Sequence, residues 1–86
     1  MYYVYVMQSK KDKQFHTGFA RDLKNRLREH NAGRVSSTKE RVLFELIYYE
    51  GCLNEQDALA REKYLKSGMG KQYLKNRLKR FLSLTG

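Results

Sequence analysis

Arg26 and His30 are the first residues of this sequence whose types and spacing suggest chemistry. They lie four positions apart in a segment with helical periodicity, so the guanidinium and the imidazole are expected on the same face of one helix. The planar fork of arginine is suited to phosphate oxygens. A pair of this kind is also common on a solvated helix face, so the spacing alone leaves both interpretations open.

Glu62 is a carboxylate beside an expected apolar stripe. Ala58, Leu59 and Leu65 define the inward face of a predicted helix, and Glu62 is three or four positions from each of them. Leaving a carboxylate unpaired on a buried face would cost several kcal/mol. Glu62 is therefore expected either to act in a functional site or to form a structural salt bridge with a neighbouring lysine or with Arg26.

Two aromatic segments before Arg26 are predicted to form a β-hairpin. Residues 2–7 (YYVYVM) are rich in β-branched and aromatic residues, and alternation places Tyr5 on one face with the other odd-numbered residues. Residues 14–20 return as the second strand, where Gly18 indicates a bend or the close approach of another backbone. On this pattern alone, Tyr5 would be a core aromatic and His16 an exposed strand residue.

Capping signals divide the next part of the chain. Asp22 is expected to cap a helix that ends near Asn31, before the stop signal Asn-Ala-Gly. Residues 34–41 (RVSSTKER) form a basic, hydroxyl-rich loop. The nearly continuous apolar run at 42–50 predicts a central strand covered on both faces, which Gly51 should break.

The last third of the chain is predicted to be helical. Asn54 is expected to cap a helix that ends near Ser67 and is terminated by Gly68, and a last helix begins near Gly70. The predicted order is therefore β-β-α-β-α-α. This is an α/β chain of the α+β type, a small three-stranded antiparallel sheet flanked by helices, and we expect residues 1–86 to form one domain.

The net charge is the most informative property of the composition. Eighteen Lys and Arg against nine Asp and Glu give +9, which favours a polyanionic partner, with nucleic acid ahead of a membrane surface. A solubilising surface is the simpler alternative. The cations expected to neutralise a phosphate backbone are in the loop and on the last helix: Arg34, Lys39, Arg41, Lys71, Lys75, Arg77, Lys79 and Arg80.

Other compositional features narrow the expected location and cofactors. No apolar run approaches the roughly 20 residues that span a bilayer, and the first residues do not resemble a signal peptide, so a cytoplasmic location is expected. The single cysteine excludes an internal disulfide, and the chain has too few cysteines and histidines for a typical zinc site.

Several motifs, in order and spacing, resemble the GIY-YIG endonuclease domain over roughly residues 2–82. The first group is Tyr3-Val4-Tyr5, His16-Thr17-Gly18, Asp22-Leu23-Lys24-Asn25-Arg26-Leu27 and His30. The second group resembles the small stand-alone bacterial branch and comprises Glu29-His30-Asn31-Ala32-Gly33, Ser36-Ser37-Thr38-Lys39 and Ala60-Arg61-Glu62-Lys63-Tyr64-Leu65-Lys66. Tyr3 stands where the first motif has its glycine, and His16 stands where the second motif has its tyrosine.

The resemblance implies a metal-dependent endonuclease with five catalytic residues. By position, Tyr5 lines the site, Arg26 contacts the scissile phosphate with His30 as its helical partner, and Glu62 holds Mg²⁺ or Mn²⁺. His16 could replace the motif tyrosine as the base, because its pKa near 6.5 suits neutral pH better than a phenol near 10. The same substitution could instead mark loss of full activity.

Three functions follow as alternatives. The first is an endonuclease with little intrinsic sequence specificity that acts on nucleic acid, with DNA expected ahead of RNA, and with a protein partner as one source of specificity. The second is a nucleic-acid-binding module of the same fold with weakened catalysis. The third is a basic adaptor that binds an acidic protein.

Overall fold

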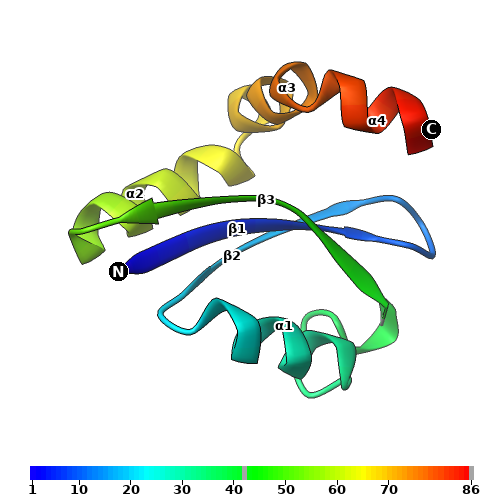
Figure 1. The fold of residues 1–86 in the computed structure, drawn as a ribbon, viewed down its shortest axis with the longest axis horizontal. Coiled ribbons are helices and arrows are strands. Elements are labelled where there is room, and N and C mark those ends of the chain that lie inside the picture. The colour runs from blue at the N-terminus through cyan, green and yellow to red at the C-terminus, as the bar shows by residue number, and fades with distance from the viewer. Residues whose placement is uncertain (42, 86) are drawn as a thin grey trace.

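Helices enclose a three-stranded antiparallel sheet in the computed structural model, which describes residues 1–41 and 43–85 (Figure 1). The elements are β1 (Tyr2–Ser9), β2 (Phe15–Ala20), α1 (Leu23–Asn31), a 3-10 helix (Lys39–Arg41), β3 (Phe44–Cys52), α2 (Glu55–Lys66), α3 (Gly68–Arg77) and α4 (Lys79–Thr85). Helix α1 lies on one face of the sheet, and α2, α3 and α4 lie on the other. The predicted fold class and the order β-β-α-β-α-α are confirmed, with the last predicted helix divided into α3 and α4.

The sheet order is β2-β1-β3, so β1 is the central strand and β3 an edge strand. The prediction of a central strand at 42–50 was therefore wrong in its position. Val42 lies outside the described residues, and Gly51 does not end the strand but pairs with Tyr3 of β1. The apolar run arises because Ile47 packs against the core on one face of the sheet and Leu46 against the core on the other. A strand whose two faces are both covered has the same apolar pattern at the edge of a sheet as at its centre, so the pattern does not reveal where the strand lies in the strand order.

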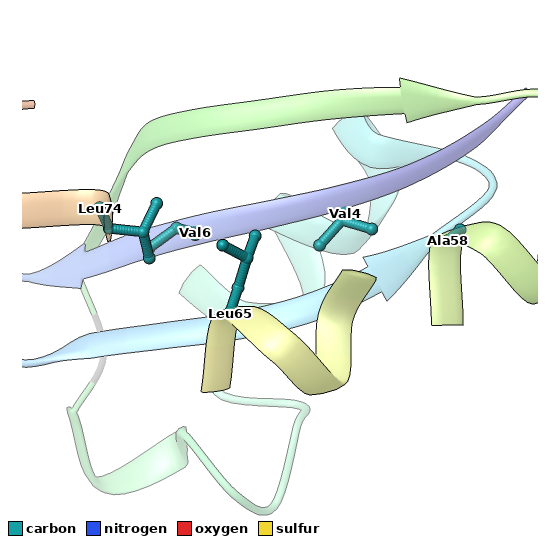
Figure 2. Packing of buried hydrophobic residues seen from close by; sticks show 5 residues of the cluster. All are labelled: Val4, Val6, Ala58, Leu65 and Leu74. Carbon is teal, nitrogen blue, oxygen red and sulfur yellow. The ribbon is translucent and has the colours of Figure 1, made fainter. Parts of the chain in front are cut away.

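Strand β1 supplies both cores, as its alternation predicts. Val4 and Val6 face α2 and α3, where they form a fully buried cluster whose other members are Ala58, Leu65 and Leu74 (Figure 2). Tyr5 and Met7 face the other way, toward α1, and pack with Ala20, Phe44, Leu23 and Leu27. Burial of each large apolar side chain contributes about 1.5–3 kcal/mol, so the hydrophobic cores on both faces depend on this one strand.

The helix boundaries follow their capping residues. The Asp22 carboxylate accepts a hydrogen bond from the Asn25 amide at 3.0 Å, and Asn54 caps α2 in the same way. Gly33 ends the α1 segment with φ 73°, a left-handed conformation that favours glycine. Ser67 ends α2 and also caps α3, since its hydroxyl accepts from the Gly70 amide at 3.1 Å. The helical region predicted to begin near Gly70 therefore begins earlier, because α3 starts at Gly68.

Helix α2 is fixed against β3 by an ion pair between Arg61 and Glu50. The Arg61 guanidinium donates to both carboxylate oxygens at 2.9–3.1 Å and lies against the rings of Tyr64 and Tyr73. Burial opposes the charged form of Glu50, but hydrogen bonds from Arg61 and Tyr48 outweigh it and lower the pKa of that carboxyl. This contact holds the helix that bears Glu62.

Within the described residues, no helix is long and apolar enough to span a membrane.

Two glycines at the α2–α3 junction give a test of this packing. A methyl group at Gly70 would overlap the Tyr64 carbonyl oxygen and the Leu65 backbone, whereas one at Gly68 would meet no atom within 4 Å. We expect Gly70→Ala to lower the free energy of unfolding by about 2 kcal/mol or more. Gly68→Ala should raise it by about 0.5 kcal/mol, because alanine loses less backbone entropy in a helix. Urea denaturation measures both, and equal effects would contradict the packing described.

Candidate active site

A pocket of about 330 Å³ lies where β1 and β2 meet the side chains of α1 and α2. Four of the residues singled out in the sequence line it, namely Tyr5, His16, Arg26 and Glu62, together with Thr17, Gly18, Phe19, Ser37, Leu59 and Lys66. His30 is not in the lining, since it is fully buried behind Tyr5. The fold thus brings together Tyr5 and Glu62, which lie far apart in the sequence.

A buried chain of hydrogen bonds fixes Tyr5. Its hydroxyl lies 2.8 Å from His30 Nε2, and His30 Nδ1 lies 2.7 Å from the Thr38 hydroxyl. All three side chains are at most 1% exposed, and both ring nitrogens of His30 obtain their hydrogen bonds from Tyr5 and Thr38. The chain links β1, α1 and the loop that follows α1. It also determines which part of the tyrosine ring faces the pocket.

Gly18 makes room for Tyr5. The two residues are directly opposite in the β1–β2 register, and a methyl group at Gly18 would overlap the Tyr5 hydroxyl. The sequence predicted a close approach at this glycine, but the neighbour is the tyrosine side chain and not a backbone. Because glycine leaves the space open, the ring can lie across β2 and reach His30.

His30 is neutral at physiological pH. Burial lowers the pKa of its imidazole to about 4, and repulsion from a protonated His16 and from the Arg26 guanidinium acts in the same direction. The Thr38 hydroxyl is also 3.4 Å from the Val35 carbonyl, to which it donates. With that donor committed, His30 Nδ1–H donates to Thr38, and Nε2 accepts the hydrogen of the Tyr5 hydroxyl.

Tyr5 keeps its proton at neutral pH. Burial raises the pKa of the phenol, Arg26 opposes this shift, and the carboxylates of Glu62 and Glu29 reinforce it. The hydroxyl therefore donates to His30, and its oxygen can still accept a hydrogen bond on the side of Arg26, which lines the pocket with it.

Arg26 has donors that the protein does not use. Its Nε atom is buried without a hydrogen-bond partner in the described part of the chain, and its contact with Glu29 is long, at 3.7 Å. Both side chains of that pair are about 40% exposed, so solvent weakens their attraction. A buried, unsatisfied guanidinium N–H beside a pocket is a donor suited to an anionic oxygen.

Glu62 pairs with Lys66 and not with Arg26. Lys66 Nζ is 3.2 Å from a Glu62 oxygen, one helical turn away, and the glutamate side chain is 20% exposed. The predicted inward face was partly wrong: Ala58 and Leu65 are buried, but Leu59 is 38% exposed and lines the pocket. Residues seven positions apart form the narrow ridge that α2 packs on the sheet, which leaves Leu59 and Glu62 at its edge.

Glu62 is the one carboxylate among the pocket's described lining residues, and the described chain has no group of three or more His, Cys, Asp or Glu that could hold a metal. A hard cation such as Mg²⁺ accepts one carboxylate when waters and phosphate oxygens complete its six positions. The donor set therefore fits Mg²⁺ or Mn²⁺ together with a phosphate-bearing substrate, provided that Lys66 moves off Glu62.

The cations predicted to bind phosphates are distributed over three regions. Lys71, Lys75 and Lys79 line hollows beside β2. Arg34 and Lys39 are exposed in the loop after α1, Arg77 and Arg80 are exposed near the α3–α4 break, and the Arg41 side chain lies outside the described part of the structure. The lysines of the first group adjoin hollows in the surface.

Two residues of the site were not assigned a role from the sequence. Thr38 lies in the hydroxyl-rich loop, but only the folded loop shows that it is buried and bonded to His30. Lys66 had a usable signal, since it follows Glu62 by four positions, the spacing of a helical ion pair.

Comparison with known proteins matches this chain to one family model and to several proteins that share the name UPF0213. The model for the GIY-YIG catalytic domain matches residues 1–79. A UPF0213 protein of Haloquadratum walsbyi is 36% identical over 67 residues, covering 77% of this chain and 74% of its own. One of Streptococcus pyogenes serotype M5 is 38% identical over 65 residues, covering 74% and 70%. The solution NMR structure of a UPF0213 protein from Bacillus halodurans has a TM-score of 0.54 at 28% identity, covering 86% of this chain and 82% of that one.

An NMR titration of the two histidines tests the buried chain of hydrogen bonds from Tyr5 through His30 to Thr38. We expect the His30 ring signals in an NMR titration to stay constant down to about pH 5, because its pKa is about 4. A His16→Asn variant assigns the signal. A His30 midpoint above pH 6 would contradict the burial and hydrogen bonding described here.

The lowered pKa of His30 also predicts a pH-dependent stability. Between about pH 6.5 and 4 the unfolded chain binds more protons at this site than the folded chain, so stability is complete above that window and falls as the pH drops through it. The His30 contribution should decrease by about 2 kcal/mol between pH 7.5 and pH 5. Urea denaturation of the native protein and of His30→Gln at both pH values isolates it, and an identical decrease in the two proteins would refute it.

Proposed function

This chain belongs to the GIY-YIG catalytic domain family, and we propose that it is a metal-dependent endonuclease that hydrolyses phosphodiester bonds with little intrinsic sequence specificity. The observation that supports the proposal is the meeting of Tyr5, Arg26 and Glu62 in one pocket. These residues supply a hydroxyl, an uncommitted guanidinium donor and a carboxylate. Phosphodiester hydrolysis requires these groups, or equivalents of them, around the phosphorus atom.

Each pocket residue has a role in the proposed reaction. Arg26 binds a non-bridging phosphate oxygen and balances the negative charge that grows there. Glu62 would hold Mg²⁺ or Mn²⁺, which when bound polarises the phosphate and lowers the pKa of water. Tyr5 accepts a hydrogen bond from the attacking water while it donates to His30, and so orients the water. Lys66 releases Glu62 and turns to the substrate's negative charge.

We assign the base to His16 and a positioning role to His30. His16 lines the pocket and is partly exposed, whereas His30 has no exposed surface and a pKa of about 4. A buried imidazole of such low basicity neither contacts a phosphate nor accepts a proton from water efficiently. His30 therefore does not orient the phosphate directly in the proposed reaction, and it acts through Tyr5.

The substrate is a nucleic acid whose backbone is bound by charge. The excess of nine positive charges and the exposed cations of α3 and α4 support a salt-dependent contact that does not read bases. We propose DNA as the substrate in preference to RNA. We also propose a cytoplasmic location and a protein partner as a source of specificity.

The second candidate function is nucleic-acid binding with weakened catalysis. One observation favours it, namely that the Lys66 ammonium neutralises the carboxylate that would hold the metal. A His16→Tyr variant separates the two candidates. A large gain in cleavage would show that His16 marks lost activity, and a loss of cleavage would show that it serves as the base.

The endonuclease proposal predicts metal-dependent cleavage that requires Glu62. Labelled single-stranded DNA, duplex DNA and RNA are incubated with the native protein in Mg²⁺, in Mn²⁺ and in EDTA. We expect Glu62→Gln to lower the rate by at least about a hundredfold. The matched control is Glu55→Gln on the same helix, which loses only an exposed 3.4 Å pair with Arg21 and should cut normally.

Two results would refute the proposal. The first is binding without cleavage on every substrate and with both metals. The second is equal cleavage by native protein and Glu62→Gln, which would place the activity elsewhere or in a contaminant.

A further inference from the structure

The catalytic pocket continues into a groove along β2. A hollow of about 360 Å³ shares His16 and Lys66 with the pocket. It shares Phe15 and Lys71 with a second hollow of about 250 Å³. That hollow in turn shares Phe15 and Lys75 with a third, of about 500 Å³, which reaches α4. Adjacent hollows with common walls form one surface path, which we call the β2 groove.

The β2 groove is positively charged throughout. Its three hollows are lined by five lysines and, among their described lining residues, by no Asp or Glu: the lysines are Lys13, Lys66, Lys71, Lys75 and Lys79. Lys71 and Lys75 are one helical turn apart on α3, about 6 Å along its axis. A row of lysines beside a path that starts at a phosphate-binding pocket is complementary to a sugar-phosphate backbone.

Phe15 gives the groove an aromatic surface. It is half-buried and lines all three hollows, and it packs against the buried cluster that contains Val4 and Leu74. It begins β2, an edge strand in the order β2-β1-β3, so within the described residues no strand pairs with the outer side of β2. An aromatic ring among lysines is the combination that binds single strands, because every unpaired base has a face that can stack. The bases of a duplex are stacked on each other and do not reach such a ring.

We propose that the β2 groove holds a single-stranded segment of nucleic acid that runs from the catalytic pocket toward Lys79. The lysines of α3 and α4 contact its phosphates, and one base stacks on Phe15. The two hollows farther from the pocket are lined by residues of the β1–β2 hairpin and of α3 and α4, elements whose arrangement is seen in Figure 1. The position of the scissile phosphate rests on the proposed nuclease function, but occupation of the groove is measurable without cleavage.

Tryptophan fluorescence tests the aromatic contact. The chain has no tryptophan, so Phe15→Trp introduces a single fluorophore. In EDTA, a single-stranded oligothymidine should quench its emission, and a duplex of the same length should quench it much less. Tyr49→Trp is the control, because Tyr49 is 56% exposed on β3, at the opposite edge of the sheet. Phe15→Leu, which keeps an apolar side chain, should weaken oligothymidine binding about tenfold by fluorescence anisotropy.

Salt dependence tests the lysines. Replacing Lys71, Lys75 and Lys79 together by Gln should reduce the slope of log K against log salt by about 2, at about 0.7 per phosphate contact of a single strand. A control with the same loss of charge outside the groove replaces exposed Lys24, Arg28 and Lys63 by Gln and should change the slope little. Circular dichroism spectra of both triple variants verify that they are folded.

The outcomes separate this inference from the nuclease proposal. If the native protein binds and cuts oligonucleotides but Phe15→Trp is not quenched and the two triple variants have equal slopes, the groove is refuted and the nuclease stands. If quenching and the slope difference are observed without cleavage, the groove stands and the nuclease fails. If oligothymidine does not bind at all, the groove is refuted.

Discussion

The hydrogen-bond chain from Tyr5 through His30 to Thr38 is the constraint on which the site depends. Three polar groups are buried together, and the hydrogen bonds between them link Tyr5 to His30 and His30 to Thr38, whose hydroxyl also donates to the Val35 carbonyl. Their common position requires β1, α1 and the loop after α1 to meet at one point. Glycine at position 18 then becomes necessary, because the ring held by this chain fills the space of its side chain.

Much of the fold could be predicted from the sequence because its signals are local. Alternation in residues 2–7 placed Tyr5 on the correct face, and Asp22 and Asn54 marked the helix starts. The edge position of β3 and the exposure of Leu59 could not be predicted, since they depend on which strands pair and on how α2 lies on the sheet. For the site, physical reasoning singled out Arg26 and Glu62 individually. Only the family resemblance placed the two in one catalytic site, and the contact of Thr38 with His30 could be found only in the folded loop.

The polar groups of the pocket are less completely satisfied by the protein than the groups buried in the cores around it. Arg26 has an unsatisfied buried donor, and Glu62 is held only by a partly exposed lysine. Such groups contribute little to stability, and both would gain from an anionic substrate accompanied by a cation. By contrast, the Arg61–Glu50 pair on the other side of α2 is fully used by the fold. One helix thus has a structural ion pair on one side and polar groups available to a ligand on the other.

In the proposed reaction, the Tyr5 hydroxyl, held by His30, orients the attacking water at the phosphate. This role is tested most directly by the single-turnover cleavage rate of Tyr5→Phe beside that of Tyr3→Phe, a tyrosine of the same strand and face that does not line the pocket. We predict that Tyr5→Phe loses about 1 kcal/mol of stability but at least about a hundredfold in rate, whereas Tyr3→Phe cuts normally. Equal rates for native protein and Tyr5→Phe would contradict the account.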